Sequence, residues 1–264
     1  MGVRLAAALA FALAATSAYP CIQNLGDLVK PVKVDPSKLS AAELRHYLTT
    51  HPPINWKARK EALSQSNTAA DRNDYAVALM HLGQPREAVA VLEKLEQTNP
   101  GRYATAANLG TAYELAGDNL KAYQWIREGI HRDPNSHEGS EWLHALILEM
   151  KIAGSISDTD SVLGLGIGHD VPPRKPIQYP RGNTRKHLDA AATKRAIAFQ
   201  LRERLQFVKP PEPIVGDILF DYANLLLIEK QYASAAALYE MAIRYAAPRL
   251  DLAKQRLAYA RKKL

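Results

Sequence analysis

The chain has 264 residues, of which 47% are hydrophobic, and it contains only four Phe. Ala and Leu supply much of the apolar content, and both favour helices over strands, so the composition predicts an all-α protein. A single cysteine excludes an intramolecular disulfide framework and a cysteine-based zinc site. The formal net charge of +7 at pH 7 indicates affinity for anionic surfaces.

Residues 1–18 have the features of a secretory signal peptide. Arg4 precedes an apolar run from Leu5 to Ala15, and small residues continue to Ala18. This order is typical of a cleaved leader, and the run is too short for a comfortable membrane span. We expect cleavage near Ala18, a periplasmic or secreted protein, and no transmembrane span in the mature chain. The residues before Cys21 match a lipidation signal poorly, so we interpret Cys21 as an incidental thiol.

Residues 19–68 are expected to be extended at first and then helical. Ser40 and Glu43 form a capping-box pattern that opens a short helix. The sequence His51-Pro52-Pro53 ends this helix, because proline disfavours helical geometry in the residue before it. A second helix is expected from Trp56 to Ser66.

Residues 69–152 contain two similar segments that align with a constant offset of 34 residues. The aligned pairs are Tyr75 and Leu109, Ala76 and Gly110, Leu79 and Tyr113, Gly83 and Gly117, Ala88 and Ala122, Leu92 and Ile126, and Pro100 and Pro134. The pattern resembles the tetratricopeptide repeat family, whose period is about 34 residues. Small residues allow close helix packing, and glycine can adopt the left-handed conformation that ends a helix. The resemblance implies an all-α solenoid of helix-turn-helix repeats.

Residues 153–183 form an insertion rich in Gly and Pro. A helical stretch from Asn135 to Lys151 precedes it, so the insertion either splits one repeat or links two repeat domains. An irregular segment of this length usually has a role in compact proteins. The spacing of Gly164, Gly166 and Gly168 departs from that of a phosphate-binding loop. We expect an ordered apolar loop that folds back onto the repeats.

Residues 184–264 are expected to contain further helices, a third repeat and a cap. A helical pattern resumes near Thr184 and runs to about Val208. Lys230 stands where the first two copies have the turn glycine, and a capping helix is expected from Pro248 to Lys263. The third copy is indicated by Tyr222, Ala223, Leu226, Ala235, Tyr239 and Ala242.

The first helix of each tetratricopeptide repeat lines a concave groove that often receives a peptide or a partner helix. Carried over by position, the expected partner-binding residues are Asn73, Val77, Met80, His81, Asn108, Thr111, Glu114, Asp217, Asp221 and Asn224. Asparagine can bond a peptide backbone through both its donor and its acceptor. The subtype that grips a C-terminal carboxylate is not matched, because Asn73 and Val77 replace its Lys and Asn.

Positive charge is concentrated in the insertion and in the tail after Pro248. The candidate basic patch consists of Arg174, Lys175, Arg181, Arg185 and Lys186. Such clusters attract anionic lipid, acidic protein or polyanions. We expect an anionic surface as a possible second partner and no nucleic acid, since the protein is predicted to be exported. The alternative is that these charges only solvate helix faces.

The remaining candidates for chemistry do not form a recognisable site. His137 and His144 are seven positions apart, whereas a metalloprotease helix needs a spacing of four. We therefore expect no catalytic residues, no metal and no cofactor. The sequence predicts a protein-interaction scaffold that binds another protein or peptide, with envelope assembly or secretion as a setting. The alternative is an enzyme or small-ligand module built around residues 153–183.

Overall fold

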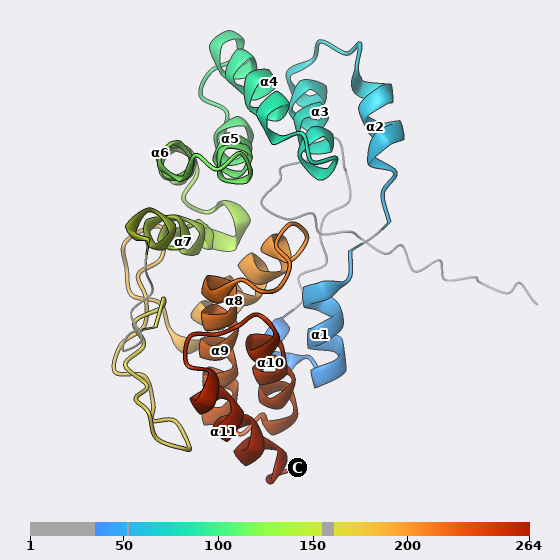
Figure 1. The fold of residues 1–264 in the computed structure, drawn as a ribbon. Coiled ribbons are helices and arrows are strands. Elements are labelled where there is room, and N and C mark those ends of the chain that lie inside the picture. The colour runs from blue at the N-terminus through green and yellow to red at the C-terminus, as the bar shows by residue number, and fades with distance from the viewer. Residues whose placement is uncertain (1–34, 52, 155–160) are drawn as a thin grey trace, which may run out of the picture.

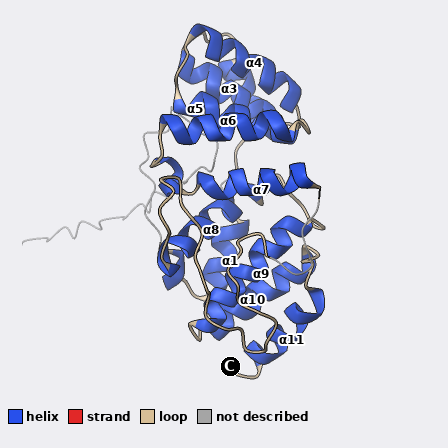
Figure 2. Ribbon diagram, turned by 90° about the vertical axis from the view of Figure 1, so that its left-hand side faces the viewer, coloured by secondary structure: helices blue, strands red, loops and turns tan. Residues whose placement is uncertain are grey.

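The computed structural model describes residues 35–51, 53–154 and 161–264. The predicted signal peptide and Cys21 lie outside these residues. The described part contains eleven α-helices, two short 3-10 helices and no strand beyond one isolated bridge between Arg181 and His187 (Figure 1 and Figure 2). The all-α class predicted from composition is therefore confirmed.

The helices follow one another along the chain as a series of antiparallel pairs and single helices. The α-helices are α1 (Ala41–Thr49), α2 (Trp56–Leu63), α3 (Ala69–His81), α4 (Pro85–Thr98), α5 (Tyr103–Leu115), α6 (Asn119–Arg132), α7 (Glu141–Ala153), α8 (Ala190–Arg204), α9 (Pro213–Ile228), α10 (Tyr232–Arg244) and α11 (Leu250–Arg261). The 3-10 helices are η1 (Pro36–Lys38) and η2 (Ser136–Gly139). The predicted helices near residues 41–49 and 56–66 correspond to α1 and α2.

The pair α3–α4 and the pair α5–α6 repeat with the offset seen in the sequence. The first helices begin at residues 69 and 103, and the second helices begin at residues 85 and 119, which is 34 residues in each case. Gly110 explains how α5 and α6 approach so closely. A Cβ atom built on it would lie 2.5 Å from Cδ1 of Ile126, so any larger residue would push the helices apart.

Three turns between paired helices share one hydrogen-bond pattern. Gly83 and Gly117 have φ of +73° and +91°, and Lys230 takes the same left-handed conformation with φ of +62°. In each turn the next amide donates to the carbonyl five residues before it, at 2.9 Å. This bond closes the end of the first helix in the manner of a glycine C-cap. The backbone requirement is the same in the α9–α10 turn, where a lysine meets it.

The apolar side chains form two cores that meet at α7. The N-terminal core is built from α3 to α6, and the C-terminal core from α1, α8 to α11 and the insertion. Helix α7 contributes to both, because Leu143 and Ile147 lie in the C-terminal core while Ala145 and Leu148 lie in the N-terminal one. Figure 1 shows α7 between the two groups of helices.

Helix α1 joins the C-terminal core although it lies early in the chain. Its capping box is formed as predicted: the Ser40 amide donates to Glu43 Oε2 at 2.8 Å, and the Glu43 amide donates to Ser40 Oγ at 3.3 Å. Leu44 and Leu48 are fully buried against that core. Arg45 also pairs with Glu240 of α10 at 2.7 Å.

Helix α8 begins at Ala190 and not at Thr184, so the predicted start is six residues too early. Residues 181–187 instead form a tight turn, in which the Gly182 amide donates to the Lys186 carbonyl at 3.0 Å. Asp189 then caps α8 by accepting from the Ala192 amide at 2.7 Å. A side-chain cap at this position defines where the helix starts.

Candidate functional site

A polar ladder runs along helices α3 and α5. The side chains of Asn73 and Asn108, one from each repeat, are both buried, and Asn108 Nδ2 donates to Asn73 Oδ1 at 2.8 Å. Thr111 lies one turn further along α5 and donates to the Ala107 carbonyl at 3.2 Å. Two of the predicted partner-binding residues, Asn73 and Asn108, are thus in direct contact, and both are buried, as is Thr111.

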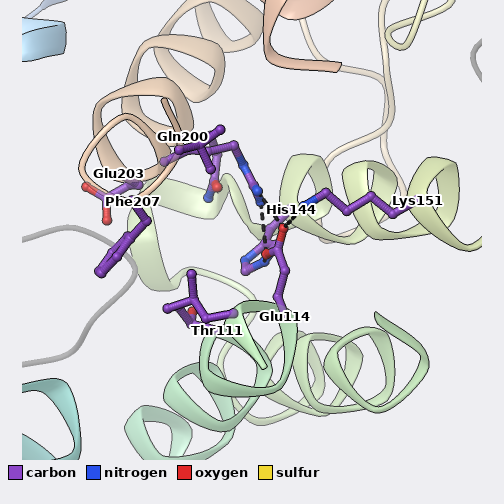
Figure 3. Close-up of a pocket in the computed structure, with 10 residues that line it drawn as sticks. Thr111, Glu114, His144, Lys151, Gln200, Glu203 and Phe207 are labelled. Atoms are coloured by element: carbon purple, nitrogen blue, oxygen red, sulfur yellow. Dashed lines mark hydrogen bonds and ion pairs between the residues drawn. The ribbon is translucent and has the colours of Figure 1, made fainter. Parts of the chain in front are cut away.

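The ladder leads to the buried carboxylate of Glu114, which three basic side chains surround (Figure 3). Arg204 of α8 binds it with two nitrogens at 2.6 and 3.2 Å. Lys151 lies at 2.6 Å and His144 Nε2 at 2.7 Å, both from α7. Burial disfavours the charged carboxylate, but Arg204, His144 and Lys151 outweigh it and hold the pKa of Glu114 well below its usual value.

A second buried carboxylate, Glu141, continues this network on the other side of His144. Its Oε2 lies 3.7 Å from His144 Nδ1, and its Oε1 contacts His137 and accepts from the Tyr103 hydroxyl at 2.9 Å. Burial alone would lower the pKa of His144, but Glu114 and Glu141 together raise it. His144 thus lies between two carboxylates that favour its protonated form, at the junction of α5, α7 and α8.

A cavity of about 80 Å³ opens beside this network. Thr111 and Leu115 of α5 form one wall, and Gln200 and Phe207, from α8 and the residues after it, form the opposite one, as Figure 3 shows for Thr111, Gln200 and Phe207. The volume is far below the roughly 300–1,000 Å³ of typical small-molecule sites. The cavity fits one side chain better than it fits a whole cofactor.

The other predicted residues of α3 do not line this cavity. Val77 and Met80 are buried in the N-terminal core. His81 lies between two aromatic rings, with its centroid 3.9 Å from that of Trp56 and 4.6 Å from that of Phe207. Burial lowers the pKa of His81 to about 4, so the ring is neutral at pH 7 and packs as an aromatic residue.

The insertion lies over the predicted partner-binding residues of α9. Asp217 accepts from the Val162 amide at 2.8 Å and pairs with Arg249. Asn224 Oδ1 accepts from the Tyr239 hydroxyl at 2.6 Å and from Arg256 Nη1 at 2.7 Å. Both predicted residues are fully buried, so the chain itself occupies the face that the sequence assigns to a partner.

Arg256 of α11 is the main anchor of the insertion. Its guanidinium is fully buried and donates to the carbonyls of Gly168 and Asp170 at 2.7 and 2.8 Å. Leu165 is fully buried in the C-terminal core, and Leu163 and Ile167 are nearly so. The insertion is therefore held both through its main chain and through apolar side chains, as the expected loop that folds back onto the helices.

A larger cavity, of about 580 Å³, lies between the insertion and α9. Gly164 and Gly168 border it, and Gln178, Asp221 and Arg249 add polar groups. Burial, and then the neighbouring Asp217, raise the pKa of Asp221 to about 7 although Arg249 opposes the shift. The third predicted α9 residue thus faces a space large enough for a small ligand.

The predicted basic patch is exposed in its entirety. Arg174 and Lys175 lie in one bend of the insertion, and Arg181, Arg185 and Lys186 lie in the turn before α8. In the part of the chain that the structure describes, no group of three or more His, Cys, Asp or Glu side chains could hold a metal ion. No described helix is long and apolar enough to cross a membrane.

Sequence reasoning missed most residues around Glu114. His144 was considered only as a metal ligand, and Arg204 only as part of a local excess of positive charge. The i, i+3 spacing of Glu141 and His144 on one helix face was the only signal of their contact. Arg204 lies 90 residues after Glu114, and no local pattern connects the two.

Comparison with protein-family profiles, curated proteins and solved structures finds no match.

Proposed function

We propose that the chain is an exported tetratricopeptide-type scaffold that binds an extended segment of a partner protein. The binding surface is the inner face of α3, α5 and α7, closed on one side by α8. The proposal involves no catalysed reaction. Its function is to hold a partner, in a setting such as envelope assembly or secretion.

The repeat geometry supports the tetratricopeptide assignment. The helix pairs recur at 34 residues, and the small residue at Gly110 allows the close packing that such repeats need. The left-handed turns at Gly83, Gly117 and Lys230 have one bonding pattern. Stacked repeats of this type generate extended concave binding surfaces.

The observation that carries the functional proposal is the contact between α9 and the insertion. There the inner face of a helix pair already holds an irregular segment of polypeptide through main-chain groups, with Asp217 bonding an amide and Arg256 bonding two carbonyls. Main-chain recognition of this kind depends little on sequence, so the same architecture can bind a segment of another chain. On α3 and α5, Asn73 and Asn108 are buried and bonded to each other, so a partner would meet these helices at the cavity that Thr111 and Leu115 line.

The cavity beside Glu114 supplies a place for one anchoring side chain of the partner. Leu115, Phe207 and Val208 make its wall mostly apolar, so we expect an apolar or aromatic anchor. Arg204 and Lys151 both pair with the buried carboxylate of Glu114. These ion pairs hold the cavity wall in place. The partner's anchoring side chain would then be recognised by its shape and by apolar contact.

The test is capture of a partner by the full mature chain, with Thr111→Phe to fill the cavity and Thr98→Phe on the exposed end of α4 as the matched control. Native mass spectrometry should identify a stoichiometric partner, and titration calorimetry should then give its affinity for each variant. We expect at least about tenfold weaker binding for Thr111→Phe only. Equal affinity of both folded variants would contradict the proposal.

The predicted export has its own test. Expression of the whole chain in a Gram-negative host, followed by N-terminal sequencing, should give a mature protein that begins directly after Ala18. An unprocessed chain retained in the cytoplasm would contradict it.

The cavity of about 580 Å³ favours a second candidate function, binding of a small polar ligand beneath the insertion. Asp221 and Arg249 would offer an acceptor and a donor to such a ligand. Native mass spectrometry of the protein purified without denaturation tests this candidate. A co-purified small molecule that is lost in Asp221→Asn would support it, and an unliganded mass for both proteins would argue against it.

A further inference from the structure

The basic side chains of the insertion and those of the tail after Pro248 have different surroundings in the structure. In the tail, the fold itself engages most of the positive charges. Arg256 is buried against the insertion, Arg249 pairs with Asp217, and Arg261 pairs with Glu240 at 2.9 Å. These three side chains are thus engaged in contacts within the protein.

The segment of residues 170–187, here called the basic segment, is different. All five of its Arg and Lys side chains are exposed. In the described part of the chain only Arg174 among them forms an ion pair, with Asp170 at 2.5 Å. Asp170 is also the single carboxylate within these residues, so the basic segment carries a net charge of +4. These side chains face solvent.

An exposed apolar side chain lies between these cations in the sequence. Ile177 is 84% exposed, more than any other large hydrophobic side chain in the described residues. Its position is fixed, because its amide donates to the Leu165 carbonyl at 3.0 Å. A Cβ on Gly166 would lie 3.0 Å from Ile177 Cδ1, so the glycine leaves just enough room for the isoleucine. The fold thus holds an isoleucine outward in water, where burial would be favourable.

The basic segment is also built rigidly. The Arg174 amide donates to the Ile167 carbonyl at 3.1 Å, and the Leu188 amide donates to the Pro180 carbonyl at 2.9 Å. Arg256 holds the carbonyl of Asp170 from below. Figure 1 shows this part of the chain, in yellow, along the outside of α8 to α11. The cations and Ile177 are therefore presented by an ordered surface.

We propose that the basic segment docks this protein onto an anionic lipid bilayer, with its five cations against the headgroup phosphates and Ile177 in the interfacial region. A soluble polyanion would use the cations but would offer no apolar phase for Ile177. A bilayer offers both, since peripheral binding combines attraction to anionic lipid with burial of apolar surface. This inference is independent of the proposed peptide groove and places the scaffold at a membrane surface.

The test uses the full mature chain and vesicles of phosphatidylcholine, either pure or with roughly one-third phosphatidylglycerol. Cosedimentation should show binding only to the anionic vesicles, and salt at about 0.5 M should abolish it. Lys175→Glu with Lys186→Glu should weaken binding by at least about 100-fold, since each unit of charge contributes about fivefold and the two reversals change the charge by four units. Lys262→Glu with Lys263→Glu changes the net charge equally and should have a much smaller effect.

The apolar contribution is tested by Ile177→Ser, with Leu120→Ser on α6 as the control because Leu120 is also an exposed apolar side chain. We expect about tenfold weaker vesicle binding for Ile177→Ser and no change for Leu120→Ser. Equal binding to neutral and anionic vesicles, or equal effects of the two lysine pairs, would overturn the proposal. So would full binding by Ile177→Ser together with complete competition by heparin, which would indicate a polyanion site. Circular dichroism melting confirms that each variant is folded.

Discussion

Helices α5 and α9 each begin a helix pair that is closed by the same turn, but their surroundings differ. The α5 face carries the asparagine ladder and ends at the Glu114 network, where α8 closes it. The α9 face is covered by the insertion, which Asp217 and Arg256 hold. A repeated backbone therefore does not decide what its inner face binds. That is decided by which distant part of the chain packs against it.

The largest loss of stability is expected from removing the contacts that hold the insertion over α9. Arg256→Ala leaves the Gly168 and Asp170 carbonyls buried without their donor, and it should lower the free energy of unfolding by roughly 3–5 kcal/mol. Lys254→Ala on the exposed side of the same helix should change it by less than about 0.5 kcal/mol. Urea titration measures both. A change below about 1 kcal/mol for Arg256→Ala, the size of one surface ion pair, would mean that the insertion is only loosely attached.

A slightly smaller effect is expected at the α5 face. Glu114→Gln removes the negative charge that balances Arg204, Lys151 and His144, and it should cost roughly 3 kcal/mol in free energy of unfolding. The control is Glu240→Gln, whose carboxylate bridges two arginines at the surface and should contribute less than about 1 kcal/mol. Equal effects would show that the buried network is no more important than a surface pair.

The network around Glu114 should also make the stability of the protein depend on pH. The pKa of His144 is raised above 6.5, so its contribution is fully present below pH 6.5 and is lost as the pH rises through the raised pKa. The pKa of Glu114 lies well below 4.5, so its contribution is present above pH 4.5 and is lost as the pH falls further. The contribution of His81 depends on pH in the opposite direction to that of His144. Its pKa is lowered from 6.5 to about 4, so the stability of the protein falls as the pH drops below 6.5.

The comparison of wild type with His144→Gln isolates the first of these contributions. The stability difference between the two proteins should be largest below pH 6.5 and should shrink at alkaline pH. Denaturant titrations at a series of pH values measure it. A difference that is constant with pH would mean that His144 is not charged in the folded protein.

The close approach of α5 and α6 predicts a more moderate effect. Gly110→Ala places a methyl group against Ile126 and should destabilise the protein by about 2 kcal/mol. Gly129→Ala on α6 meets its nearest atom at 3.6 Å, so it should be neutral or stabilise by up to about 1 kcal/mol through helix propensity. Thermal melting compares the pair, and equal shifts would show that the two helices can separate freely.

The smallest expected effect is at the turns. Lys230 adopts a left-handed conformation that Gly83 and Gly117 adopt without strain, so Lys230→Gly should stabilise the protein by about 1 kcal/mol. Gly83→Ala should destabilise it by a similar amount, about 1 kcal/mol. If Lys230→Gly is destabilising, the lysine side chain must contribute contacts that outweigh its backbone strain.

The sequence alone predicted the helical class, the 34-residue period, the capping box of α1 and the turns at Gly83 and Gly117. These features depend on interactions between residues a few positions apart, such as caps and helix-ending glycines. The start of α8 was placed too early, because the residues from Thr184 are compatible with a helix but form a tight turn that Asp189 ends. Local compatibility does not decide between two structures when distant packing favours one of them.

Only the tertiary structure decided which long-range partners meet. The sequence indicated Asp217, Asp221 and Asn224 as partner-binding residues and predicted a loop that folds back onto the repeats, but it did not indicate that this loop would lie over these residues. The sequence likewise did not predict the pairing of Glu114 with Arg204 or the internal contacts of the basic side chains in the tail. The reason is physical: a helix is determined by neighbours within a few turns, whereas the resting place of an irregular segment depends on burying apolar side chains such as Leu165 against surfaces formed elsewhere.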